Sequence, residues 1–305
     1  MGRELVRQLS AEGCHVAMCD VSTDSMNETK ALALAECPAG TRVTTFAADV
    51  ADETQMLAFA AAVRTDHDCE HINLLFNNAG IGGGGSFVAD RREEWDKTFA
   101  VCWNGVYNGC RAFMPLLLRS DEGHVINTSS MNGFWASLGP NTPHTAYSAA
   151  KFAVKGFTEA LITDFRVNAP HLKASVVMPG HIGTSIAINS LTAHGRNPKD
   201  MTAEQLSDER VRLARMGLPV DDASDEDVRA GLILLTEQFH DNAPLTAAQA
   251  ATVILEGVRR GEWRILVGED AHLYDIAIRE DPVSAYEPSF VETMAARGGG
   301  ISIVR

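Results

Sequence analysis

The sequence lacks the clusters of basic residues with which proteins bind nucleic acids or anionic membranes. Its 305 residues include 26 lysines and arginines against 40 aspartates and glutamates, a net charge of −14, and they contain no basic run. Because phosphate-rich surfaces select for patches of lysine and arginine, we expect no nucleic acid and no membrane as a partner. The acidic excess is interpreted as a solvated face that keeps the protein soluble.

Metal-binding motifs, a signal peptide and long apolar runs are also missing. None of the cysteines forms a CxxC motif or a metal-like pairing with histidine, which predicts isolated thiols and no metal site. Charged residues interrupt the start of the chain, and no apolar run is long enough to span a bilayer. The sequence therefore predicts a cytoplasmic protein. The six cysteines are Cys14, Cys19, Cys37, Cys69, Cys102 and Cys110.

Short apolar stretches alternate with helical stretches along most of the chain, without internal repeats. The apolar stretches show no strict alternation of polar and apolar residues, as expected for parallel strands that are covered on both faces. The pattern predicts a doubly wound parallel α/β sheet, the Rossmann fold. Strands are expected at 15–19, 42–49, 72–76, 124–129, 173–179 and 263–268, and helices at 23–36, 52–65, 91–119, 146–167, 224–239 and 246–260.

We expect a single catalytic domain over residues 1–268, followed by a C-terminal extension over 269–305. Within the domain, residues 184–223 are polar and irregular, which is typical of a lid over a substrate. The extension contains one short helical pattern, DAHLYDIAI, and its end, ARGGGISIVR, is expected to be frayed or used in subunit contacts.

The chain begins with a helix where a strand would be expected. Leu5, Val6 and Leu9 recur at helical spacing, and Gly13 is suited to end the helix with a positive φ. The strand at 15–19 follows directly. Since a helix that feeds a parallel strand normally comes from a strand of its own, the first strand of the fold is absent.

Small or polar residues follow each predicted strand, at the edge where ligands bind in open parallel sheets. Asp20 could accept hydrogen bonds from the ribose near adenine and repel a 2′-phosphate, which favours NAD over NADP. The alternative is that Asp20 caps the following helix, and Asp49 could likewise mark a helix start. The residues at these strand ends are Asp20, Asp49, Asn77 to Gly80, Ser129, Ser130 and Pro179 to Thr184.

Tyr147 and Lys151 lie four residues apart in a predicted helix and so project from one face. A free tyrosine has a pKa of about 10, and a nearby ammonium favours the phenolate and lowers that pKa. The pair is therefore a candidate general acid and base for a substrate oxygen. The spacing alone is weak, because the same two residues could form an ordinary surface pair.

The motifs NNAG, SSMNG, YSAAK and PGHIGT, in this order, resemble the classical short-chain dehydrogenase/reductase family. The resemblance covers residues 2 to 183 and implies a Rossmann fold, a nicotinamide cofactor and hydride exchange between an alcohol and a ketone. It implies that Tyr147 exchanges the proton, that Lys151 lowers its pKa and holds the nicotinamide ribose, and that Ser130 orients the substrate. Ser130 fits this role better than Ser129, because adjacent side chains of a strand point to opposite faces.

The resemblance also implies a set of cofactor-binding residues. Asp49 and Val50 would lie beside the adenine, and the NNAG motif would support the sheet and the adenosine side. The loop after the strand at 173–179 would hold the nicotinamide. The implied set is Gly2, Asp20, Asp49, Val50, Asn77, Asn78, Ala79, Gly80, Tyr147, Lys151, Pro179, Gly180, Ile182 and Thr184.

Two departures from the family pattern bear on activity. Cys102 stands where the family has an asparagine that relays protons, and Asn104 lies about 200° further around the helix, so we do not expect it to substitute. Of the glycine-rich turn TGxxxGxG only Gly2 is present, together with the helix start that presents N–H groups to a phosphate. We interpret the chain as an amino-terminally truncated form of a longer enzyme; the alternative is a protein that has given up tight cofactor binding.

Two functions follow from these patterns. The first is an NAD(H)-dependent dehydrogenase or reductase acting on a small hydrophobic alcohol or ketone, and the second is a catalytically silent scaffold. The glycines of GIGGGGSF are interpreted as a flexible rim of the active site, and His181 and His194 as polar surface residues. The helices at 91–119 and 146–167 are expected to pair in a homodimer or homotetramer.

Overall fold

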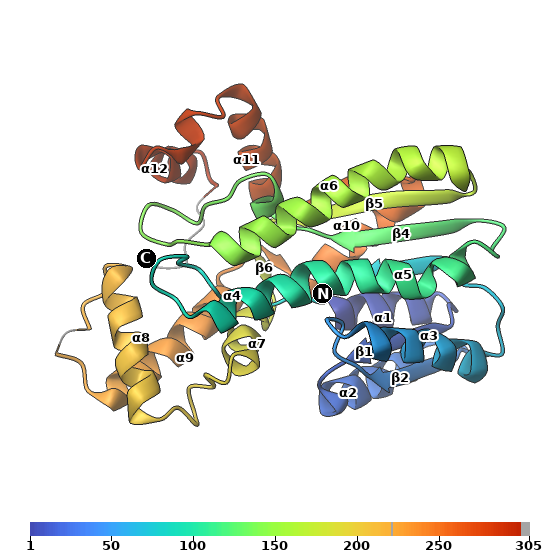
Figure 1. Ribbon diagram of the computed structural model, residues 1–305, viewed down its shortest axis with the longest axis horizontal. Helices are drawn as coiled ribbons and strands as arrows, with labels where there is room; N and C mark the ends of the chain where they lie inside the picture. The colour runs from blue at the N-terminus through green and yellow to red at the C-terminus, as the bar shows by residue number, and fades with distance from the viewer. Residues whose placement is uncertain (221, 300–305) are drawn as a thin grey trace.

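Parallel strands alternate with covering helices in the structure, a computed structural model that describes residues 1–220 and 222–299 (Figure 1). The strands are β1 Val16–Asp20, β2 Val43–Ala47, β3 Leu74–Asn77, β4 Gly123–Thr128, β5 Leu172–Pro179, β6 Ile182–Gly183, β7 Leu245–Thr246 and β8 Arg264–Val267. The larger helices are α1 Gly2–Ala11, α2 Thr23–Glu36, α3 Glu53–His67, α5 Gly105–Leu117, α6 Thr145–Asn168, α8 Ala203–Arg215, α9 Asp225–Asp241, α10 Ala247–Arg260 and α11 Glu269–Glu280. Shorter helices are α4 Arg92–Phe99, α7 Ile186–Ala193 and α12 Ser289–Ala296.

The described strands form three groups, all paired in parallel: β2 with β1, β3–β4–β5–β8, and β6 with β7. The doubly wound parallel α/β fold is confirmed. No ladder joins β1 to β3 within residues 1–220 and 222–299. This break separates β1 and β2 from the group β3–β4–β5–β8. Leu5 of α1 and Phe76 of β3 belong to one apolar cluster beside it.

Local signals in the sequence determine where the helices begin and end. Gly13 follows α1 with a φ of +87°, as expected. The hydroxyl of Ser22 accepts a hydrogen bond from the backbone of Ser25 at the start of α2, and Asp52 does the same for α3. Thr202, Ser224 and Thr246 form capping boxes at the starts of α8, α9 and α10.

The sheet is buried on both faces. The adjacent residues Val125 and Ile126 of β4 are both fully buried, yet they belong to different apolar clusters. One cluster includes residues of α3, α5 and α6, and the other includes residues of α1 and α10. Because adjacent side chains of a strand point to opposite faces, helices cover the sheet from both sides.

The segment 184–223 is more regular than expected. It contains α7 and α8, so its interpretation as an irregular segment is wrong for most of its length. Leu206 and Leu213 of α8 are buried against Val228 and Leu232 of α9. These contacts stabilise helices that polar composition alone did not indicate. Residue 221 lies outside the described residues.

The C-terminal extension packs against the loop that follows β4 (Figure 1). Tyr274 of α11 and Met294 of α12 form one apolar cluster with Trp135 of that loop. The indole nitrogen of Trp135 also donates to the carbonyl of Ala285 at 2.8 Å. The short helical pattern after 269 is confirmed as α11, whereas the expectation for the last residues concerns 300–305, which lie outside the described residues.

Across the part of the chain that the structure describes, none of the helices combines the length and the apolar character that a membrane crossing requires.

Candidate active site

The candidate site lies at the carboxyl edge of the parallel strands. β1 ends at Asp20, β3 at Asn77, β4 at Thr128 and β5 at Pro179. Parallel strands present their carboxyl ends at one edge, so the polar residues that follow them are gathered there. Helix α6 brings Tyr147 and Lys151 to the same edge.

Tyr147 and Lys151 lie together in the first turns of α6. The Nζ atom of Lys151 lies over the Tyr147 ring, 5.3 Å from its centre, and donates a hydrogen bond to the Thr128 carbonyl at 2.8 Å. The lysine is 2% exposed. A buried ammonium is thereby held between the end of β4 and the phenol by one hydrogen bond and one cation–π contact.

Ser130 joins this pair. Hydrogen bonding with Ser130 acts on the Tyr147 phenol and favours its ionised form. Ser129 points elsewhere, since its hydroxyl donates to the backbone carbonyl of Lys151 at 2.7 Å. The structure therefore brings Ser130, Tyr147 and Lys151 into one cluster, while Ser129 fastens α6 to the end of β4.

The protonation states differ from the expectation. Burial raises the pKa of Tyr147, the neighbouring Cys102 raises it further, and only Ser130 lowers it. Burial also lowers the pKa of Lys151. Burial thus disfavours the charged forms of both groups, and the lowering of the Tyr147 pKa by Lys151 stays a prediction.

Cys102 lies beside the cluster in a widened stretch of helix. Residues Ala100–Asn104 form a π-helical segment between α4 and α5, so the single helix expected over 91–119 is interrupted here. The Cys102 thiol is fully buried and donates to the carbonyl of Ile81 at 3.2 Å. Asn104 is exposed, which agrees with the expectation that it does not replace the missing asparagine.

His144 also lies beside Tyr147, which the sequence did not predict. Its ring lies 4.7 Å from the ring of Tyr147. Burial lowers the pKa of His144 to about 4, so this imidazole is neutral at pH 7. No sequence pattern distinguished this histidine from the others.

The acidic residues after β1 and β2 do not cap the helices that follow them. The carboxylate of Asp20 is exposed and accepts a hydrogen bond from the Ser22 backbone at 2.9 Å, whereas the cap of α2 is Ser22. Asp49 accepts from the Ala51 backbone at 2.9 Å, and the cap of α3 is Asp52. The capping alternatives for Asp20 and Asp49 are therefore wrong.

Val50 and Asn77 form hydrogen bonds that link neighbouring elements of the fold. The Val50 carbonyl accepts a hydrogen bond from the Asn108 side chain at 3.0 Å. The buried Asn77 amide donates to the Asn127 side chain at 2.8 Å and so links β3 to β4. Ala79, the third residue of NNAG, is exposed.

Asn78 lies near the diphosphate end of the expected cofactor site, beside Gly2, and Gly80 lies near its nicotinamide end, beside Lys151. A side chain at Gly2 would approach the Asn78 amide to 2.9 Å, so the start of α1 lies against the end of β3. The side-chain oxygen of Asn78, Oδ1, is buried and has no hydrogen-bond partner among the described residues. A side chain at Gly80 would lie 3.3 Å from the Lys151 Nζ atom.

The loop Pro179–Thr184 completes this edge. Pro179 pairs with Val267 of β8, and the backbone of Gly180 donates to the Val267 carbonyl at 2.9 Å. Ile182 pairs with Leu245 of β7, and the Thr184 side chain accepts a hydrogen bond from the backbone of residue 186.

These residues fit a nicotinamide dinucleotide. An exposed carboxylate lies at the β1 end, and a buried amide oxygen beside the start of α1 lacks a partner among the described residues. The Lys151 ammonium lies close to Gly80. Asp20 would hold the adenine ribose, the start of α1 the diphosphate, and Lys151 with the Pro179–Thr184 loop the nicotinamide end.

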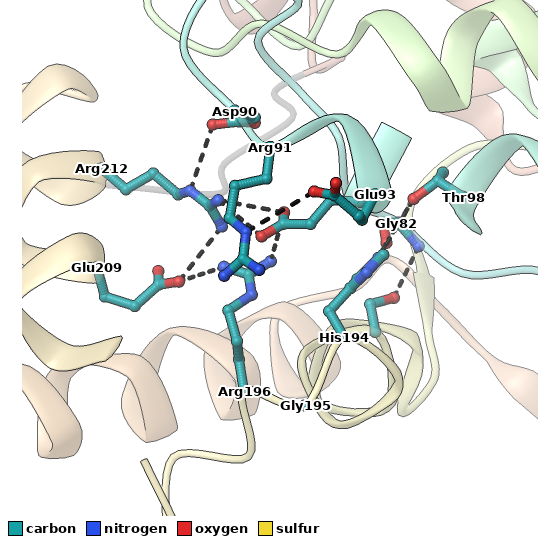
Figure 2. A network of polar contacts seen from close by, with 12 residues as sticks. Gly82, Asp90, Arg91, Glu93, Thr98, His194, Gly195, Arg196, Glu209 and Arg212 are labelled. Carbon is teal, nitrogen blue, oxygen red and sulfur yellow. Dashed lines mark hydrogen bonds and ion pairs between the residues drawn. The ribbon is translucent and has the colours of Figure 1, made fainter. Parts of the chain in front are cut away.

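A network of buried charges fastens the segment 184–223 to the region after β3 (Figure 2). Arg212 of α8 pairs with Asp90, Glu94 and Glu209, and Arg196 pairs with Glu94 and Glu209. Burial, together with the nearby carboxylates, raises the pKa of Glu209 to about 7. The network lines a cavity of about 590 Å³, which is separate from the Tyr147 cluster.

Two further interpretations need correction. His194 is part of the lid contacts, where its ring bonds with the Gly82 carbonyl at 2.9 Å and with Thr98 at 3.2 Å (Figure 2). His181 is 7% exposed and its ring bonds with the Phe239 carbonyl at 2.7 Å. Neither histidine is therefore a free surface residue.

The glycine loop is also more tightly packed than a flexible rim. A side chain at Gly83 would meet His194 at 2.2 Å, and one at Gly85 would meet the Pro143 carbonyl at 2.5 Å. The glycines therefore permit close packing against α7 and the start of α6. No group of histidine, cysteine and acidic side chains able to hold a metal ion occurs within the described residues.

The fold and the residues at its carboxyl edge define a dinucleotide-binding protein of the doubly wound class. The family model of short chain dehydrogenases matches residues 1–194. The chain belongs to the short-chain dehydrogenase/reductase family and is an oxidoreductase of that family.

Several relatives and solved structures are similar to this chain. SadH of Mycobacterium tuberculosis, which is named as an oxidoreductase, is 32% identical over 279 residues, covering 92% of this chain and 86% of SadH. Levodione reductase of Leifsonia aquatica is 31% identical over 195 residues, covering 63% and 68%. A short-chain dehydrogenase/reductase from Burkholderia phymatum in complex with NAD is 25% identical, with a TM-score of 0.70 over 93% of this chain and 90% of that one. A metagenomic short-chain oxidoreductase in complex with NADP is 28% identical, with a TM-score of 0.51 over 59% and 76%.

Proposed function

We propose that the protein transfers a hydride between NAD(H) and a small hydrophobic secondary alcohol or ketone. The observation that carries this proposal is the cluster of Ser130, Tyr147 and Lys151 at the end of β4. Its position at the carboxyl edge of the sheet suits a nicotinamide cofactor and a substrate that meet there.

The residues of the chain supply position and proton transfer. The Tyr147 hydroxyl exchanges the proton of the substrate oxygen, and the Ser130 hydroxyl orients that oxygen. Lys151, fixed by the Thr128 carbonyl, holds the ribose and brings positive charge to the phenol. When bound, the nicotinamide supplies or accepts the hydride.

NAD is the proposed cofactor because of Asp20. This carboxylate is exposed at the end of β1, where it would bond the ribose hydroxyls and repel a 2′-phosphate. The similar structure from Burkholderia phymatum contains NAD, whereas the metagenomic relative contains NADP. Fold likeness alone does not separate the two cofactors, so the proposal depends on the carboxylate.

A homodimer or homotetramer is the proposed assembly, formed through α5 and α6. Tyr107 of α5 is 43% exposed and Phe152 of α6 is 41% exposed. Exposed aromatic side chains on neighbouring helices are typical of the buried centre of an interface. A cytoplasmic location is proposed from the charged start of the chain and its short apolar runs. The role of 184–223 as a substrate lid is proposed from its polar composition.

The second candidate function is a catalytically silent scaffold. The buried Cys102 favours it, since this residue stands where the family has an asparagine that relays protons. The two functions differ in whether the protein binds a dinucleotide and catalyses turnover of a substrate.

The test is an absorbance assay at the reduced-nicotinamide band. The purified chain is mixed with NAD⁺ or NADP⁺ and a panel of secondary alcohols, and in the reverse direction with NADH and ketones. Turnover with NAD(H) at least about tenfold more efficient than with NADP(H) supports the proposal. Absence of turnover together with absence of dinucleotide binding by calorimetry supports the scaffold.

A further inference from the structure

The loop Pro179–Thr184 is held by parts of the chain that follow it by 55 residues or more. Its backbone bonds with Val267 of β8, and its short strand pairs with Leu245 of β7. The ring of His181 bonds with the Phe239 carbonyl of α9. The nicotinamide end of the proposed cofactor site is thus shaped by the C-terminal third of the protein.

Asp270, in the first turn of α11, makes the most direct of these contacts. One carboxylate oxygen accepts a hydrogen bond from the His181 backbone at 2.6 Å. A side chain at Gly180 would lie 2.2 Å from this same oxygen and 2.3 Å from the other one, so the carboxylate lies directly against the loop backbone. Hydrogen bonds to an ionised acceptor are about twice as strong as neutral ones.

The same carboxylate is buried and incompletely paired. Asp270 is 8% exposed, and its Oδ1 atom has no hydrogen-bond partner among the described residues. One helical turn along α11, the fully buried Tyr274 hydroxyl also has no partner in that part of the chain. Burial and the charge of Asp270 raise the pKa of Tyr274, so this phenol stays protonated. A buried carboxylate with one unpaired oxygen lowers the stability of the fold. We therefore expect a role of Asp270 other than stabilisation.

Helix α11 also reaches the loop that carries Ser130. The Tyr274 ring lies 4.8 Å from the ring of Trp135, which follows Ser130 by five residues. The Trp135 indole donates to the Ala285 carbonyl just beyond α11. One helix therefore contacts both loops on which the proposed chemistry depends.

We propose that Asp270 is a positioning residue that fixes the backbone of residues 180–182 in the conformation that receives the nicotinamide end of the cofactor. Tyr274 supports it by packing between Asp270 and Trp135. The inference rests on the proposed oxidoreductase function and deepens it. It also assigns a role to α11, which lies outside the residues 1–194 that the family model matches.

The test compares Asp270→Ala with Asp270→Asn in the full chain. The amide of Asn can still accept the His181 hydrogen bond, whereas alanine cannot. Asp275→Asn is the matched control, because Asp275 is a buried carboxylate of the same helix that pairs with Arg264 and Arg279 and not with the loop. The measurements are hydrogen exchange of the peptide that contains residues 180–183, the Kd for NAD⁺ and NADP⁺ by calorimetry, and kcat and KM.

Asp270→Ala is expected to speed exchange of the loop amides and to raise the Kd for the preferred dinucleotide about tenfold or more. Asp270→Asn should recover most of this loss, and Asp275→Asn should leave both quantities within about twofold of the wild type. If Asp270→Ala does not fold, Asp270→Ser carries the test, because the shorter hydroxyl side chain does not reach the His181 backbone; faster loop exchange and a raised Kd relative to Asp275→Asn are then the expected result.

A Kd and loop exchange within about twofold of wild type in the variant that removes the His181 hydrogen bond, or equal losses in Asp275→Asn, would overturn the inference alone. Wild-type protein that binds neither NAD⁺ nor NADP⁺ would overturn the proposed function, and the inference with it. The two failures are distinguished by the wild-type binding measurement.

Discussion

The ammonium of Lys151 lies over the face of the Tyr147 ring, 5.3 Å from its centre, while its hydrogen bond goes to the Thr128 carbonyl. Helix α6 carries both side chains, and the hydrogen bond to the end of β4 fixes the position of the ammonium over the ring. Burial is the largest influence on the phenol and raises its pKa. The phenol is therefore protonated at neutral pH.

This protonation state can be measured by spectrophotometric titration. Burial raises the pKa of Tyr147 above the ordinary value of about 10, so its phenolate is absent from pH 7 to 10. The difference in tyrosinate absorbance between wild type and Tyr147→Phe isolates this residue from the other three tyrosines. We expect that difference to develop only above pH 10. A tyrosinate signal that develops below pH 9 would show that Lys151 outweighs burial.

Asp20 is predicted to set the cofactor preference. Asp20→Ala removes the carboxylate that would bond the adenine ribose, so the KM for NAD⁺ should rise about tenfold. The KM for NADP⁺ should stay the same or fall, because repulsion of the 2′-phosphate is removed. Steady-state kinetics with both cofactors check this, with Asp24→Ala in α2 as the control. An unchanged ratio of the two efficiencies would contradict the prediction.

The stabilisation that depends on Glu209, in the buried charge network of the segment 184–223, is predicted to fall as the pH rises. Glu209 has an ordinary pKa of 4.5 and a pKa of about 7 in the folded protein. The folded state therefore holds this proton more strongly than the unfolded state. The resulting stabilisation is fully present below pH 4.5 and is lost as the pH rises through 7.

Glu209→Gln should remove this part of the pH dependence. The charged groups around Glu209 are Asp90 and Glu94 from the region after β3, with Arg196, Asp208 and Arg212 from the segment 184–223. The free energies of unfolding of the variant and of wild type, measured from pH 5 to 8, should converge at low pH and diverge at high pH by about 3 kcal/mol at most. The exposed Glu93→Gln serves as the control. Parallel curves for Glu209→Gln and wild type would show that Glu209 does not titrate in this range.

Assembly through α5 and α6 is predicted to depend on Phe152. Phe152→Asp places a charge in the proposed interface and should weaken association on the order of thirtyfold or more. Sedimentation velocity measures the effect, with Val211→Asp on the exposed face of α8 as the control. A wild-type monomer, or an unchanged assembly of Phe152→Asp, would reject this interface.

The sequence predicted the elements of the fold and the members of the candidate cluster because both depend on local patterns. The strands end at residues close to those expected, and Tyr147 and Lys151 share a face of α6 through helical spacing. The break between β1 and β3 likewise follows from the pattern at the start of the chain.

The contacts that sequence reasoning missed join residues far apart in the chain. Asp270 meets His181 across 89 positions, and Arg212 meets Glu94 across 118. No local spacing signals such pairs. Helix α8 of the segment 184–223 was missed for a related reason, since its apolar residues Leu206 and Leu213 are buried against α9, which follows later in the chain.

The central claim is that the Tyr147 hydroxyl exchanges the substrate proton. The most direct test is kcat for Tyr147→Phe, measured at saturating NAD⁺ with the best alcohol of the panel. The account predicts a loss of about a hundredfold to ten-thousandfold in kcat, with a Kd for NAD⁺ within about threefold of wild type. A variant that keeps more than about a tenth of the wild-type kcat would contradict it.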